Sequence, residues 1–241
     1  MCCVSCATRA SRSAAGPEIT PDGFVPACVI AGIAQDAGAS SDPAKAGTPN
    51  DAAESFSRTS DALWVSREVM ALRRAEAARA DVPVEPYLDA AANIITDKYV
   101  IVECHVFSDL KDENLAQDAV GFHGISAYLL DADGRKTMPL QTIIGTPVKV
   151  EENASGKRFS RTNLIVFSKN DVWTGAQTLP ASLASVRLVL ECPASRSYFE
   201  WAGASPSQAG AALSPQQSAR ILETGFTEFY EKVFGLTHLL D

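Results

Sequence analysis

The residues best suited to catalysis or metal binding are three histidines and six cysteines. His105 follows Glu103 by two positions in an alternating stretch, which puts both side chains on one face of a strand, where a metal ion would need a third ligand. Nucleophilic catalysis needs a serine or cysteine with a base beside it, and no G-x-S-x-G elbow presents such a serine. We therefore expect no catalytic residue and no metal site, and we interpret Glu103 and His105 as a solvated pair.

Cofactor and nucleic-acid chemistry is excluded on similar grounds. The sequence contains neither G-x-x-x-x-G-K-[ST] nor G-x-G-x-x-G, so no glycine-rich loop cradles a phosphate group. The 241 residues carry a net charge of −8, which repels the phosphate backbone of DNA or RNA. We expect no cofactor and no nucleic-acid partner.

Two cysteines are predicted to lie on the core-facing sides of two different strands. Cys104 and Cys192 both occur on the apolar side of an alternating run. A disulfide between them would close a long loop and stabilise the fold by about 4 to 5 kcal/mol in the chain-entropy model. The alternative is two buried free thiols that act as small apolar groups.

Residues 94–203 carry the strand signals. Side chains alternate between apolar and polar in several runs, and Asp133-Gly134 predicts a two-residue hairpin turn between 125–131 and 136–144. About seven strands with no long helix between them predict an antiparallel β-sandwich, because parallel strands need helical crossovers. The resemblance to immunoglobulin-like sandwiches is one of architecture, and the fold class is mainly β with flanking α-helices.

Helices are predicted on both sides of this domain. Residues 61–93 form a helical lead-in that starts with Asp61 as the N-cap, buries Val65, Val69 and Leu72, and turns its arginines to solvent. Residues 204–241 form a linker and a long amphipathic helix, because Ser214 and Gln217 make a capping box. Its apolar seam recurs at spacings of three and four and consists of Ala219, Leu222, Phe226, Phe229, Val233, Leu236 and Leu240.

Residues 1–60 are rich in Ala, Ser, Gly, Asp and Pro, and they predict a disordered leader or tether. The apolar run 24–34 is too short to span a bilayer, but it has the length of a signal-peptide apolar region behind Arg9 and Arg12. This favours an exported protein of the periplasm or cell envelope, with the N-terminus as a membrane tether. In the alternative, the run is a buried strand and the protein is cytoplasmic.

We therefore expect a non-enzymatic binding or assembly component whose partner is another protein or a second copy. The predicted contact surface joins the helix seam to an outer aromatic strip, and it comprises Leu222, Phe226, Phe229, Val233, Leu236, Tyr99, Ile101 and Phe107. In the alternative interpretation, the helix seam covers the open face or edge of the sandwich of its own chain. Two other functions stay open, namely a ligand carrier or enzyme whose pocket between sheet and helix uses His105 or His123, and an intracellular structural subunit.

Overall fold

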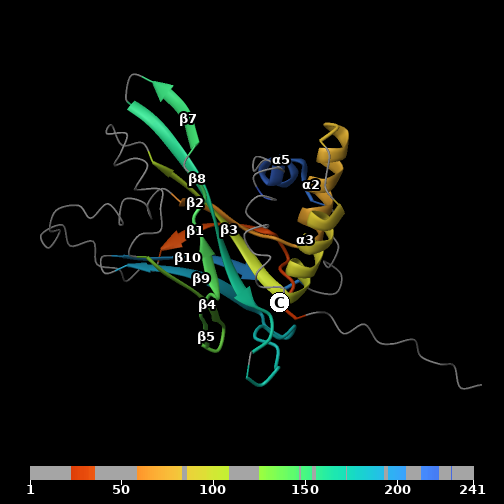
Figure 1. The fold of residues 1–241 in the computed structure, drawn as a ribbon. Coiled ribbons are helices and arrows are strands. Elements are labelled where there is room, and N and C mark those ends of the chain that lie inside the picture. Colours follow the sequence, from red (N-terminus) through yellow and green to blue (C-terminus); the bar gives the residue numbers. More distant parts are fainter. Residues whose placement is uncertain are drawn as a thin grey trace, which may run out of the picture.

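The chain is mainly β in the computed structural model, with two antiparallel sheets and few helices (Figure 1). The structure describes residues 23–35, 59–82, 86–108, 125–146, 148–153, 156–171, 173–192, 195–204, 213–222 and 229. The strands are β1 (Ile30–Gln35), β2 (Thr59–Trp64), β3 (Tyr99–Ser108), β4 (Ser126–Asp131), β5 (Lys136–Thr137), β6 (Gln141–Ile143), β7 (Val148–Asn153), β8 (Gly156–Ser168), β9 (Ser185–Cys192) and β10 (Ser195–Ala202). The helices are α2 (Arg67–Arg79), α3 (Pro86–Lys98) and α5 (Pro215–Leu222).

Strand β1 joins the two sheets. Its first half, from Ile30 to Gly32, pairs with β2, and its second half, from Ile33 to Gln35, pairs with β10. The strand order is β5-β4-β9-β10-β1-β2-β3-β8-β6, and β7 also pairs with β8. The second part of the apolar run 24–34 is thus a strand in the middle of this order. Composition alone does not distinguish such a strand from the apolar region of a signal peptide.

One hydrophobic cluster takes residues from both sheets. Trp64 of β2 lies edge-on to Trp201 of β10, with 5.4 Å between ring centroids, and Phe24 is 5.5 Å from Trp64. The indole N–H of Trp201 donates to the carbonyl of Val29, which satisfies the polar atom of a buried ring. The other buried members are Ala31, Ala62, Val100, Val102, Cys104, Ala127, Leu129, Ile165, Phe167, Leu179, Val186, Leu188, Leu190 and Phe199.

A second cluster lies where the helices cover β2, β3 and β8. It contains Val29, Leu63, Val65, Val69, Met70, Ile95, Ile101, Leu164, Val166, Ile221 and Phe229. Figure 1 shows α2, α3 and α5 gathered on one side of the strands. Both faces of β3 are therefore buried, which corrects the expectation of an exposed outer strip, because Ile101 is fully buried and Tyr99 half-buried.

The predicted lead-in helix exists, but Asp61 does not cap it. Ser66 is the N-cap of α2 and its hydroxyl accepts from the N–H of Val69, whereas Asp61 lies in β2. The second helix, α3, continues to Lys98, past the boundary predicted at residue 94.

The hairpin of β4 and β5 forms around a loop one residue longer than predicted. Gly134 has φ +81° and the Asp131 carboxylate accepts from the N–H groups of Asp133 and Arg135, which is typical of a three-residue loop. The partner strand is short, because Pro139 has no N–H to continue the ladder. The chain then crosses to the other sheet, where β6 pairs with β8.

Helix α5 begins as predicted. The backbone N–H of Gln217 donates to the Ser214 hydroxyl, and the Ser214 N–H donates to the Gln217 side chain, which completes the capping box. The buried face differs from the predicted seam, since Ile221 is fully buried and Ala219 is exposed. Phe226, Val233, Leu236 and Leu240 lie outside the described residues, so the long helix stays a prediction.

Candidate functional site

The polar residues singled out by the sequence meet on the helix-covered face of β3. Glu103 of β3 is fully buried, and Arg73 of α2, which we expected on the surface, is only 1% exposed. Two hydrogen bonds join them, from Arg73 Nη1 to Glu103 Oε1 at 2.6 Å and from Nη2 to Oε2 at 2.8 Å. The carboxylate that we expected in solvent is therefore one half of a buried ion pair, because the helices cover this strand on its outer side.

The same guanidinium holds the C-terminal segment. Arg73 Nε and Nη2 donate to the carbonyl of Ile221 of α5 at 3.3 and 3.2 Å. The guanidinium also lies over the ring of Phe229, 4.7 Å from its centroid. One buried cation thus connects α2, β3, α5 and Phe229.

A second ion pair lies beside the first. Arg220 of α5 donates through Nε to Asp61 Oδ2 at 2.6 Å and through Nη2 to Asp61 Oδ1. Asp61 is opposite His105 in the register of β2 and β3. His105 is opposite Thr162 of β8, and its Nε2 lies 3.3 Å from the Thr162 hydroxyl.

These contacts give the polar residues structural roles. Each side chain is hydrogen-bonded to another group of the same chain, and a buried charge needs such a partner. In the part of the chain that the structure describes, no three His, Cys, Asp or Glu side chains are grouped to hold a metal ion.

Cys104 lies on the other face of β3 as a buried free thiol. Burial raises the pKa of this thiol far above its ordinary value, and the carboxylates of Asp61 and Glu103 raise it further. Such a thiol stays protonated and is a poor nucleophile. The side chain of Cys192 lies outside the described residues, so the disulfide with Cys104 stays a prediction that the free thiol does not support.

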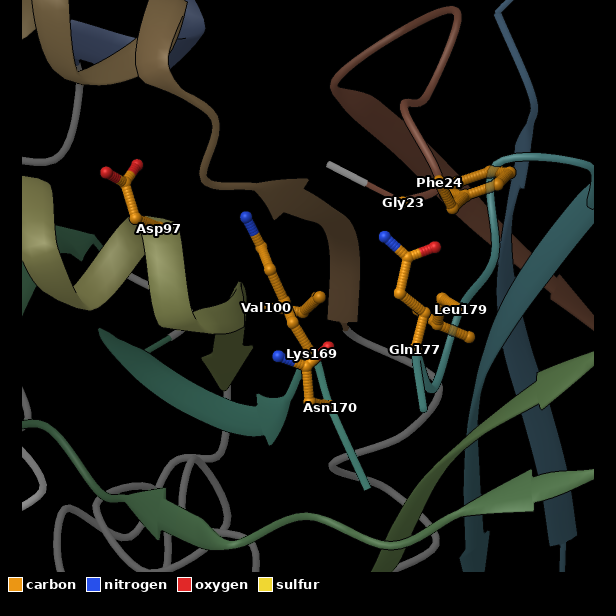
Figure 2. A pocket seen from close by; sticks show the side chains of 8 residues that line it. All are labelled: Gly23, Phe24, Asp97, Val100, Lys169, Asn170, Gln177 and Leu179. Carbon is orange, nitrogen blue, oxygen red and sulfur yellow. The ribbon is translucent and has the colours of Figure 1, made fainter. Parts of the chain in front are cut away.

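A small cavity of about 130 Å³ lies elsewhere in the fold. It is lined by Gly23, Phe24, Asp97, Val100, Lys169, Asn170, Gln177 and Leu179 (Figure 2). Asp97 is bound by Arg67 at 2.9 Å. The volume is below the 300 to 1,000 Å³ usual for ligand pockets. His105 does not line this cavity and His123 is outside the described residues, so the cavity does not supply the predicted pocket between sheet and terminal helix.

The predicted contact surface is not an exposed one where the structure describes it. Phe229 and Ile101 are fully buried and Leu222 is half-buried, so the segment covers its own sheet at these positions. The side chains of Phe107, Phe226, Val233 and Leu236 lie outside the described residues.

Exposed apolar side chains occur instead between β5 and the residue that follows β6, in a segment that the sequence assigned to a partner strand. Met138 is 61% exposed, Leu140 47% and Ile144 42%. Together with Thr142, which is also exposed, they alternate with the half-buried residues Pro139, Gln141 and Ile143. We call the side chains of Met138, Leu140, Thr142 and Ile144 the β6 strip. The sequence predicted a strand over 136–144, but such a prediction does not say which side chains are covered.

Comparison of the chain with protein-family models, with curated proteins and with solved structures finds no match. Among the described residues, none of the helices combines the length and the apolar character that crossing a membrane requires.

Proposed function

We propose that this protein is a non-enzymatic binding or assembly component that contacts a protein partner through the β6 strip. The observation that carries the proposal is the exposure of three large apolar side chains within seven consecutive positions at the end of a sheet. Contiguous apolar surface of this kind usually marks a contact site, whereas single exposed residues such as Trp173 are common on any surface.

The charged residues on the helix-covered face of β3 are engaged within the fold. Arg73, Glu103, Asp61 and Arg220 are engaged with one another across α2, α5 and the sheet. These ion pairs hold the helices on the sheet. A ligand that displaced one member of a pair would leave the other member as a buried charge without a partner.

In its finer detail, the proposed architecture is a sandwich of the immunoglobulin-like kind, with a C-terminal helix that continues beyond Leu222. The cluster that takes residues from both sheets supports the sandwich. The buried ring of Phe229 supports the longer helix, since it belongs to the same cluster as Ile221.

The proposed location is the cell envelope, on the grounds of Arg9, Arg12 and the apolar run behind them. The pairing of β1 adds a condition to this proposal. Cleavage after Gly32 or Ala34 would divide the strand that joins the two sheets, so the proposal requires that the apolar run serves export without being cleaved and stays in the mature chain.

The binding proposal is tested by affinity capture from an extract of the native host with the tagged full-length chain. Thr142→Lys places a charge in the β6 strip, and Ser126→Lys adds the same charge at an exposed position of β4, at the other end of the strand order. We expect wild type and Ser126→Lys to retain a protein, either the untagged chain itself or a different protein, and Thr142→Lys to lose it. Equal capture by the two variants, or no capture by any, would contradict the proposal.

A further inference from the structure

We propose that the partner of the β6 strip is a second copy of this chain, paired antiparallel along β6 about a two-fold axis at Thr142. This inference rests on the proposed function and names its partner. It is carried by the position of β6, by the pattern of its side chains and by their charge.

Strand β6 is the last strand in the order and pairs with β8 alone among the described strands. An edge strand presents backbone N–H and C=O groups that another strand can bind. The chain is held on both sides of β6, since the Leu140 N–H donates to Val166 O at 2.8 Å and the Gly145 N–H donates to the Asn163 side chain at 3.2 Å. The edge is therefore ordered before any partner arrives, which lowers the entropic cost of association.

The residue pattern is self-complementary. With Thr142 opposite its own counterpart, Leu140 lies opposite Ile144 of the second copy, and Ile144 lies opposite the second Leu140. Strand β6 spans Gln141–Ile143, and Leu140 and Ile144 flank it directly. Pairing that extends by one residue at each end of β6 would join the two β6 strips into one apolar surface across the axis, because residues two apart on a strand share a face. A shift of one residue would place Leu140 opposite the half-buried Ile143 and would break this match.

Charge favours the same arrangement. Two copies of a chain with a net charge of −8 repel each other, and facing segments that carry no charge add no local repulsion to this. The segment 137–148 contains no Asp, Glu, Lys, Arg or His. Because salt screens the overall repulsion and leaves apolar contact intact, the dimer should strengthen as ionic strength rises.

The first experiment measures the mass of the full-length protein by sedimentation equilibrium at low and high salt. A contact of one short strand belongs to the small and weak interfaces, so loading concentrations should run from about 10 µM to about 1 mM. We expect the wild-type mass to rise from 25.6 kDa towards twice that value, more steeply at high salt. Thr142→Lys brings two like charges together at the axis and should stay monomeric, whereas Ser126→Lys has the same net charge and should dimerise as wild type.

The second experiment tests the register by cross-linking. Thr142→Cys and Met138→Cys are each made in a background in which Cys2, Cys3, Cys6 and Cys28 are serine. Cysteines at 142 face each other in the proposed pairing, within the Cα separation that a disulfide needs, whereas a cysteine at 138 faces Thr146 of the second copy. We expect Thr142→Cys to form a disulfide-linked dimer at least ten times faster than Met138→Cys.

A wild-type mass that stays at the monomer value, a dimer that Thr142→Lys leaves intact, or equal cross-linking at the two positions would each overturn the inference. If the protein is monomeric but captures a different protein through the β6 strip, the second copy is excluded while the binding function stands. If it is monomeric and captures nothing, both are wrong.

Discussion

The buried ion pair of Arg73 and Glu103 makes a quantitative prediction about stability. Glu103→Gln keeps the shape of the side chain but leaves the Arg73 guanidinium buried without an opposite charge. The two side chains are 1% and 0% exposed, so solvent screens the loss very little. Removing one partner of a buried pair costs about 3 to 5 kcal/mol. For a chain of this length, that corresponds to a fall in melting temperature of roughly 6 to 20 °C.

Removing both charges should cost less than removing one. Arg73→Met combined with Glu103→Leu leaves no unpaired charge, and apolar replacement of a buried pair is often neutral. The carbonyl of Ile221 would still lose its donor, which costs about 1 to 3 kcal/mol. We therefore expect the double variant to be more stable than Glu103→Gln and less stable than wild type.

Urea unfolding at fixed pH, followed by circular dichroism, measures these differences as free energies of unfolding, with the m-value checked in each variant. Asp97→Asn is the matched control, because its pair with Arg67 is 48% and 67% exposed and should contribute about 0 to 1 kcal/mol. If Glu103→Gln were no more destabilising than Asp97→Asn, or if the double variant were the least stable, the assignment of a buried ion pair would be wrong.

Three other predictions follow. Folding raises the pKa of Cys104, so as the pH rises the unfolded chain loses the thiol proton before the folded chain does. Above about pH 8.5 the free energy of unfolding should therefore fall, relative to Cys104→Ala, by up to about 1.4 kcal/mol per pH unit. Urea unfolding measures this difference. Gly23→Ala should destabilise the fold more than Gly134→Ala in the same assay. Both glycines have φ +81°, but a Cβ at Gly23 would lie 2.7 Å from the Leu179 carbonyl oxygen, whereas Gly134 faces open space. Mass spectrometry of the protein from its host should find an N-terminus before Gly23, and a mature chain that begins after Ala34 would contradict the central position of β1.

Local signals predicted much of the fold. The capping box at Ser214 fixes the start of α5, because the two residues that satisfy each other are three positions apart. The alternation of Val100, Val102 and Cys104 marked β3 as a strand with a buried face. These features depend on neighbours in the sequence, and so they can be recognised without the rest of the chain.

The burial of the second face of β3 could not be predicted in this way. It depends on helices α2 and α5, whose contacts with the strand are set by packing between distant segments. A signal was nevertheless present, since Arg73 lies four positions from both Val69 and Ala77, on the buried face of α2. A cation within one apolar face and a carboxylate, Glu103, within another are what a buried ion pair between two elements requires.

The free energy available from burying the exposed apolar side chains near β6 favours the proposed contact. Burying a large aliphatic side chain gains about 1.5 to 3 kcal/mol, and the monomer forgoes much of this gain at Met138, Leu140 and Ile144. Ile101 and Phe229, which the sequence assigned to the same role, already realise it within the chain. Among the described residues, three of the exposed large apolar side chains therefore lie together at the β6 edge, and pairing of two such edges would bury Leu140 and Ile144 without placing any charge in the contact.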